Sequence, residues 1–304
     1  MLNFNEFREE VKRRIMEDLK DFHIVEIRET NVSKKNNGLN LHGISPVIEG
    51  TNITPNIYLD KIYEMYTETG DLESNISEIE NVLAESIKNV PSEILNIAEN
   101  FKKTDFVKDK IVMKLINAKN NEEFLETHPH DNVMDLAIIY KVRLSDEASI
   151  TITNEHLKNW DFDESKLYEI ARENMKTLMP AQIISMDELL AHNQDLPEEL
   201  KEVIDNTPNE NKQWVVTNEQ EFDGAVNILF SENLEKLANI IKHDFYILPS
   251  SVHEVICINE NLGEPEAANQ MVREVNATAV SPEEVLANHI YKYSLETKTI
   301  ESIE

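Results

Sequence analysis

The sequence of 304 residues has a single cysteine, Cys257, which excludes an internal disulfide. This cysteine lies between Ile256 and Ile258 in a run of strand composition. A reactive thiolate needs an electropositive and partly exposed setting, which these neighbours do not supply. We therefore expect Cys257 to be a small buried hydrophobe.

Glycine is also scarce, with six residues in the chain. None of them stands in a G-x-G-x-x-G or G-x-x-x-x-G-K-[ST] pattern, so neither common cradle for nucleotide phosphates is present. The patterns H-E-x-x-H, C-x-x-C and G-x-S-x-G are missing as well. These absences disfavour a nucleotide-dependent enzyme, and we expect no cofactor.

Long apolar runs are missing too, since none approaches the roughly 20 residues that a membrane helix needs. The first residues, Met1–Glu6, carry an acid early and no apolar segment before a cleavage site, which argues against a secretory signal. Hydrophobic residues make up 40% of the chain, as in soluble globular proteins. We expect a cytoplasmic protein without membrane contact.

Basic residues are few relative to acidic ones. The chain has 29 Lys and Arg and 58 Asp and Glu, which gives a formal net charge of −29 at pH 7. Binding to DNA or to an anionic membrane depends on Lys and Arg, so this balance disfavours both. The acids are scattered among lysines and never form an uninterrupted block, which is typical of a solvated surface. A mimic of DNA phosphates that inhibits a nucleic-acid enzyme remains an alternative.

The N-terminal third predicts helices and a hairpin. Residues 4–19 have apolar side chains on one helical face, and residues 23–28 and 39–44 are strand-like runs around an Asn37-Gly38 turn. Further helices are expected from their apolar spacing and caps, one ending at Gly70, one capped by Asp71 and one capped by Ser92.

The middle of the chain alternates strand-like and helical patterns. Strands are predicted at residues 111–116, 134–143 and 148–153. Asp163 is expected to cap a helix that Pro180 stops, Ser185 and Glu188 are spaced as a capping box, and residues 192–212 have the composition of a linker.

The C-terminal part predicts strands at residues 214–216, 225–230 and 290–294 and a hairpin at 245–258. Ser231 is expected to cap a helix, residues 264–275 are helical, and Ser281–Glu284 reads as a capping box that starts another helix. Strand pairs with segregated helices indicate an α+β fold with antiparallel sheets in two parts. We divide the chain into an N-terminal α+β domain (1–155), a helical connector with a polar linker (156–212) and a C-terminal α+β domain (213–304).

The turn inside the 245–258 hairpin carries the residue types of a nucleophile, a base and an orienting acid: Ser250, Ser251, His253 and Glu254. In a strand, residues 253 and 254 point to opposite faces, so Glu254 cannot orient its neighbour. We therefore expect the hydroxyls to satisfy a tight turn and the turn to be structural. Arg273, Glu274 and Asn276 are expected to face it and complete a polar cluster that serves either binding or structure.

The best candidate metal ligands are His128 and His130, with Asp135 nearby, because imidazole and carboxylate suit zinc or iron. The two histidines flank Pro129 and resemble the H-x-H-x-D-H loop of metallo-β-lactamase-type hydrolases, but the aspartate spacing and the final histidine are missing. A turn before the next strand also explains these residues. Because three further metal ligands would have to come from unmarked positions, we expect no metal.

Four segments, residues 53–60, 245–258, 272–276 and 282–286, resemble a family of uncharacterised bacterial proteins defined as a domain of unknown function, DUF5688. The resemblance extends along most of the chain and implies no activity. Our preferred interpretation is a non-enzymatic protein that binds another macromolecule, with a protein partner expected. The alternatives are a hydrolase that uses Ser251 and His253, or a metal at His128 and His130, and the DNA mimic described above.

Overall fold

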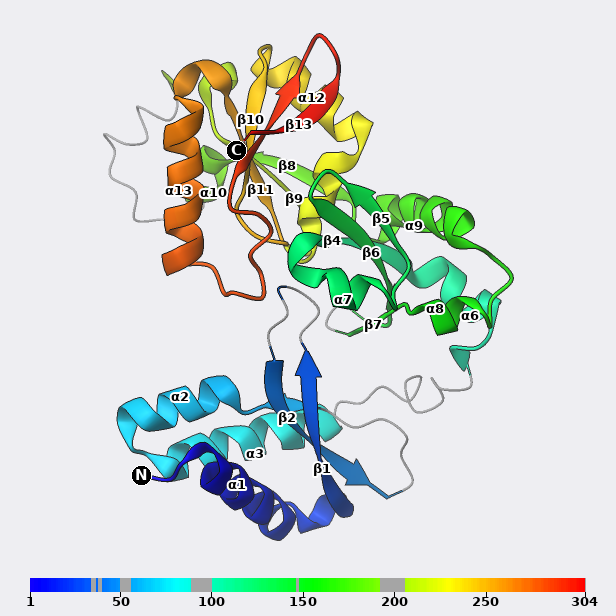
Figure 1. Ribbon diagram of the computed structural model, residues 1–304, viewed down its shortest axis with the longest axis vertical. Helices are drawn as coiled ribbons and strands as arrows, with labels where there is room; N and C mark the ends of the chain where they lie inside the picture. Colours follow the sequence, from blue (N-terminus) through cyan, green and yellow to red (C-terminus); the bar gives the residue numbers. More distant parts are fainter. Residues whose placement is uncertain are drawn as a thin grey trace. The chain divides into compact units, whose positions relative to one another are not determined.

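The computed structural model describes residues 1–33, 37, 40–49, 56–88, 100–145, 148–191 and 206–303 (Figure 1). The chain forms two compact units, the first of residues 1–34 and 38–102 and the second of residues 35–37 and 103–304. This division groups residues 103–155 with the C-terminal residues, whereas the sequence pattern places them in the N-terminal part. The three-part division into domains stays a prediction.

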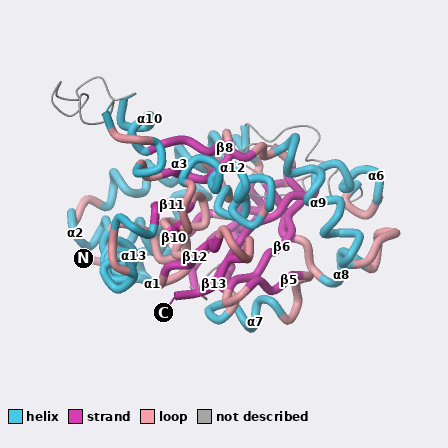
Figure 2. The backbone as a smooth tube through the Cα atoms, turned by 90° about the horizontal axis from the view of Figure 1, so that it is seen from above, coloured by secondary structure: helices cyan, strands magenta, loops and turns pink. Residues whose placement is uncertain are grey.

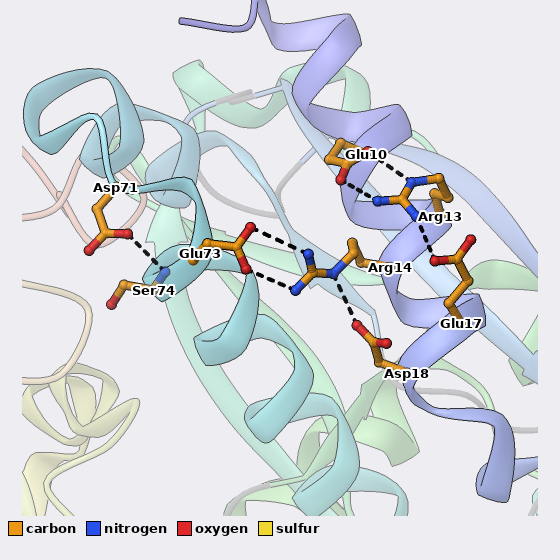
Figure 3. Close-up of polar contacts among 8 residues, drawn as sticks. All are labelled: Glu10, Arg13, Arg14, Glu17, Asp18, Asp71, Glu73 and Ser74. Carbon is orange, nitrogen blue, oxygen red and sulfur yellow. Dashed lines mark hydrogen bonds and ion pairs between the residues drawn. The ribbon is translucent and has the colours of Figure 1, made fainter.

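The helices that the structure describes in the first unit are α1 (Phe4–Asp18), α2 (Asp60–Thr69) and α3 (Leu72–Lys88), together with the short 3-10 helix η1 (Lys20–Phe22). Gly70 ends α2 with a positive φ of 71°, and the Asp71 carboxylate accepts a hydrogen bond from Ser74 N at 3.1 Å, as the sequence predicts. On the surface of α1, Arg13 pairs with Glu10 and Glu17, and Arg14 pairs with Asp18 and with Glu73 of α3 (Figure 3).

The sheet of this unit has the order β1 (Ile24–Ser33), β2 (Asn40–Ile48) and β3 (Ile57–Tyr58), all antiparallel, which confirms the predicted hairpin. Apolar side chains from the helices and strands meet in one core. Its fully buried members are Phe7, Val11, Ile15, Ile44, Leu59, Ile76 and Leu83.

The second unit begins with a four-stranded antiparallel sheet of β4 (Ile111–Asn117), β6 (Leu136–Arg143), β5 (His130–Val133) and β7 (Ser149–Thr151). The helix α9 (Glu164–Leu178) packs on it, capped by Asp163 as predicted. Shorter helical turns connect these elements: α6 (Thr104–Val107), η2 (Lys108–Lys110), η3 (Lys119–Asn121), α7 (Glu122–Leu125) and α8 (Asn154–Leu157).

A six-stranded antiparallel sheet follows in the order β13-β12-β10-β11-β9-β8 (Figure 2). Its strands are β8 (Ala181–Ser185), β9 (Trp214–Asn218), β10 (Phe245–Pro249), β11 (Val255–Asn259), β12 (Ile290–Ser294) and β13 (Thr299–Ile303). The helical segments of this part are α10 (Met186–Ala191), η4 (Asn209–Asn211), η5 (Gly224–Leu229), α12 (Ser231–Ile241), η6 (Glu260–Leu262) and α13 (Pro265–Thr278). The three antiparallel sheets confirm the predicted α+β class.

Helix α13 lies against one face of this sheet (Figure 1). Its inner residues Ala268 and Val272 pack on Tyr246 and Leu248 of β10 and on Ile290 of β12. The Asn269 amide donates to Ile303 O of β13 at 3.1 Å, and its oxygen accepts from Ile290 N at 2.8 Å. These two hydrogen bonds tie α13 to the last two strands, so its outward face has a fixed orientation on the sheet.

Three sequence predictions for the C-terminal part are wrong. The segment predicted as a strand at residues 225–230 lies mostly in the 3-10 helix η5 (Gly224–Leu229), because the Asn227 side-chain amide donates to Thr217 O at 3.1 Å and holds a compact turn. Ser231 is the first residue of α12, and its N-cap, Phe230, has no capping side chain. Ser281–Glu284 forms a turn instead of starting a helix, with Glu284 N donating to Ser281 O at 2.8 Å.

One further prediction is confirmed, and two others concern residues that the structure does not describe. The capping box is present before α10, where Glu188 N donates to Ser185 Oγ at 3.2 Å and Ser185 N donates to Glu188 Oε2 at 3.1 Å. The helix expected after Ser92 and the first part of the 192–212 linker lie outside the described residues. Strand β13 was not predicted.

Candidate functional site

The turn between β10 and β11 is held by the side chains that sequence reasoning singled out. Ser251 Oγ donates to Glu254 Oε1 at 3.0 Å and accepts from His253 N at 2.9 Å. Ser251 N in turn donates to Glu254 O at 3.2 Å. The hydroxyl therefore satisfies the turn, as the sequence indicates for a structural role.

The imidazole of His253 points away from the Ser251 hydroxyl. Its Nδ1 accepts a hydrogen bond from Asp223 N at 3.0 Å, and its Nε2 lies 3.4 Å from Glu284 Oε1. The ring also lies against Phe222, with 5.1 Å between ring centroids. A serine nucleophile needs its hydroxyl hydrogen-bonded to the base, and here that proton is directed to Glu254.

A buried charge cluster lies beside this histidine, and the sequence does not reveal it. The Asp223 side chain is 3% exposed, and its two oxygens lie 2.8 Å from Lys114 Nζ and 2.6 Å from Lys141 Nζ. Burial opposes ionisation of Asp223, but the two ammonium groups outweigh it and lower the pKa of the carboxyl. Burial also lowers the pKa of Lys141, even though Asp223 favours its charged form.

The backbone of the loop that carries Asp223 is closely packed. Asp223 has a positive φ of 52°, a conformation that aspartate tolerates better than most residues. The next residue is Gly224, where an added Cβ would lie 2.6 Å from Thr217 Oγ1 and 2.7 Å from His253 O. The loop, the end of β9 and the turn at His253 are therefore packed as one rigid unit.

Arg273 and Asn276 do not join the turn. The Asn276 amide donates to Ala287 O at 2.8 Å and to Asn288 Oδ1 at 2.9 Å. Arg273 lines a pocket of about 550 Å³ at the first half of α13, together with Glu264, Pro265, Glu266 and Asn269. In the described residues neither side chain bonds to Ser250–Glu254, so the structure separates the predicted polar cluster into two places.

The candidate metal ligands are each engaged with protein groups. His128 Nδ1 lies 2.7 Å from Phe124 O, and His130 Nδ1 lies 2.9 Å from His128 O. Asp135 accepts a hydrogen bond from Tyr291 Oη at 2.8 Å and lies 3.5 Å from His289 Nε2. Within the part of the chain that the structure describes, no three histidine, cysteine or acidic side chains converge as a metal site.

The outward face of α13 is the second feature of interest. Met271 is 57% exposed and Val275 is 40% exposed, one helical turn apart. Leu262, in the turn before the helix, is 50% exposed. The exposed polar residues of α13 and its start include three acids, Glu264, Glu266 and Glu274, and one cation, Arg273.

Fold and surface together define an antiparallel α+β protein. It has a hydrogen-bonded turn at Ser251 and an exposed apolar strip, Met271 and Val275, on α13. The family model described as "Family of unknown function (DUF5688)" matches residues 4–295, and the chain belongs to this family. No curated protein and no solved structure matches the chain. None of the helices that the structure describes is long and apolar enough to cross a membrane.

Proposed function

We propose that this is a cytoplasmic protein that acts by binding another protein through the outward face of α13, without catalysing a reaction. The observation that carries the proposal is the pair Met271 and Val275. The inner face of α13 already packs on the sheet through Ala268 and Val272, and Met271 and Val275 are not among the residues of that core cluster. Exposed apolar side chains with a polar rim are typical of interaction surfaces.

The charges around this strip define the partner. Glu264, Glu266 and Glu274 are exposed on α13 or at its start, and the chain as a whole has a formal charge of −29. Complementary potentials steer association and select partners. The expected partner is therefore a protein that presents a cationic amphipathic helix, with apolar residues against Met271 and Val275 and Lys or Arg against the acids.

Hydrolysis at the Ser251 turn is less well supported. Ser251 Oγ donates to Glu254, and His253 directs one ring nitrogen to Asp223 N and the other toward Glu284. The contacts of these side chains are those of a structural turn, which agrees with the preferred interpretation of the sequence.

A defined probe tests the proposal. A fluorescent peptide of about 18 residues, long enough to form an amphipathic helix of leucine and lysine, is titrated with the protein and followed by anisotropy. We expect Met271→Glu/Val275→Glu to weaken binding on the order of 10-fold, because it removes the central apolar contacts.

The matched control is Met65→Glu/Val82→Glu on α2 and α3, where the two side chains are 41% and 50% exposed. It adds the same charge and removes the same residue types, and we expect binding within about 2-fold of wild type, as for a position outside the interface. Equal effects of the two double variants would show that the peptide responds to net charge alone, and the assignment to α13 would then be wrong.

A further inference from the structure

We propose that a small monovalent anion, chloride or one carboxylate group, binds beside Lys141 in the buried cluster of Lys114, Lys141 and Asp223. Two ammonium groups share one carboxylate here, at 2.8 and 2.6 Å. In the described residues no other acid lies within ion-pair distance of either lysine. The cluster thus has one positive charge more than its own carboxylate balances.

Strand pairing places both lysines on one face of the sheet. Lys114 of β4 lies opposite Ile139 of β6, and Lys141 of β6 lies opposite Val112 of β4, so the two side chains emerge on the same side. Asp223 approaches this face from the loop after β9, held by its bond to His253 and by the close packing at Gly224. The backbone positions of the two lysines cannot separate without disrupting the sheet.

Burial makes the charge imbalance costly. The side chains of Lys114, Lys141 and Asp223 are 17%, 12% and 3% exposed. An unpaired charge at such a position is unfavourable unless a counter-charge is supplied. The Phe222 ring, 5.1 Å from Lys141 Nζ, supplies part of the compensation through a cation–π contact. Burial lowers the pKa of Lys141, in keeping with a cation that lacks a full counter-charge.

A cavity in front of Lys141 provides the space. Its volume is about 20 Å³, and its lining consists of the charged side chains of Lys141, Arg143 and Asp223, of Ser145 and Ser149, and of the apolar Val112, Ala148, Met179 and Phe222. This volume has room for about one water-sized atom. Arg143 Nη1 already donates to Leu178 O at 3.0 Å, which fixes the guanidinium next to the cavity. The lining offers the Lys141 ammonium group and the Ser145 and Ser149 hydroxyls beside the Asp223 carboxylate, and the size fits chloride or one carboxylate oxygen but not a phosphate group.

Thermal unfolding at constant ionic strength tests the site. The sodium salt of a bulky sulfonate is replaced stepwise by sodium chloride or sodium formate. Sodium phosphate serves as the control, because its anion is too large for the cavity. We expect the unfolding temperature to rise with chloride and formate concentration, because a ligand of the folded state stabilises it. Phosphate stabilises folded proteins in general by exclusion from their surface, so we expect it to raise the unfolding temperature of wild type and of Lys141→Met equally. Lys141→Met leaves Lys114 and Asp223 balanced one to one and should abolish the rise with chloride and formate, whereas Lys236→Met, at an exposed position on α12, should keep it.

Several results would overturn the proposal: no rise in the wild type with chloride or formate, an equal rise in Lys141→Met, or a phosphate-induced rise in the wild type that Lys141→Met abolishes. If Lys141→Met does not fold, the test is instead the chloride NMR signal in the presence of wild type. We expect the wild type to broaden this signal and formate to reverse the broadening. Absence of broadening would then contradict the proposal. Asp146 and Glu147 follow Ser145 in the sequence. A response that appears only in Asp146→Asn/Glu147→Gln would show that the chain supplies its own anion, and the proposal would be wrong.

Discussion

Gly224 is the residue with the least freedom to change. A Cβ there would lie 2.6 Å from Thr217 Oγ1, 2.7 Å from His253 O and 2.8 Å from Asn218 N, and two of these three atoms belong to the backbone. We expect Gly224→Ala to destabilise the protein by about 1–3 kcal/mol, as overpacking does. Gly263→Ala is the control, because nothing lies within 4 Å of its added Cβ, and it should stay within about 0.5 kcal/mol in chemical denaturation.

The Ser251 turn gives a second prediction at this scale. Ser251→Ala and His253→Ala should each cost on the order of 1–2 kcal/mol in free energy of unfolding, since each leaves backbone or side-chain partners unsatisfied. Urea unfolding measures the cost. If His253→Ala unfolds like wild type yet abolishes binding or a hydrolytic activity, the turn is a functional site and its structural assignment fails.

Local chemistry explains which residues could be assigned from the sequence. The bonding of Ser251 within its turn and the caps at Asp71 and Asp163 follow from neighbours three residues away. The cluster of Lys114, Lys141 and Asp223 joins residues up to 109 positions apart, which only the fold brings together. No local pattern signals such a contact.

Helices and hairpins with strong local signals can be predicted from the sequence, whereas the secondary structure of short apolar runs cannot. The run Ala225–Phe230 has strand composition, but such runs do not distinguish strand from helical segments. Tertiary bonds decide, because Asn227 donates to Thr217 O and accepts from the Asn233 amide at 2.8 Å. At Ser281–Glu284 the capping motif is overridden in the same way, since Val252 N donates to Glu284 O at 2.8 Å.

Strand β11 provides a prediction on packing. Val255 is 2% exposed, so Val255→Ala should lower the free energy of unfolding by about 2–4 kcal/mol through lost transfer energy and a cavity. Val275→Ala is the same substitution at an exposed site on α13 and should stay within about 0.5 kcal/mol. Similar losses for both variants in urea unfolding would contradict the burial of this strand.

Asp135, in the turn between β5 and β6, is hydrogen-bonded to Tyr291 of β12. This contact predicts that the free energy of unfolding depends on pH. Burial opposes ionisation of Asp135, but the nearby His289 ring and the hydrogen bond from Tyr291 outweigh it and lower the pKa of Asp135 below the ordinary 3.8. A lowered pKa stabilises the folded state above pH 3.8, and this contribution disappears as the pH falls through the folded-state pKa. Asp135→Asn should therefore be less stable than wild type at pH 7, with a difference that shrinks toward pH 3; a constant difference would exclude the ionised carboxylate as its source.

The charge of the whole molecule gives a prediction about nucleic acid. With a formal net charge of −29, the chain should not bind double-stranded DNA at physiological salt, because few phosphates can be neutralised. Arg13 and Arg14 on α1 are already paired with acids (Figure 3). A gel-shift titration tests this, and a salt-sensitive complex with duplex DNA would show that the charge argument is wrong.

Binding of a protein partner through α13 is the central claim, and capture from the native cell tests it most directly. Wild type, Met271→Glu/Val275→Glu and Met65→Glu/Val82→Glu are immobilised, and bound proteins are quantified by mass spectrometry. We predict one protein with a cationic amphipathic segment that wild type and the α2–α3 variant retain and the α13 variant loses. Equal retention by all three, or no protein that distinguishes the two double variants, would contradict the account.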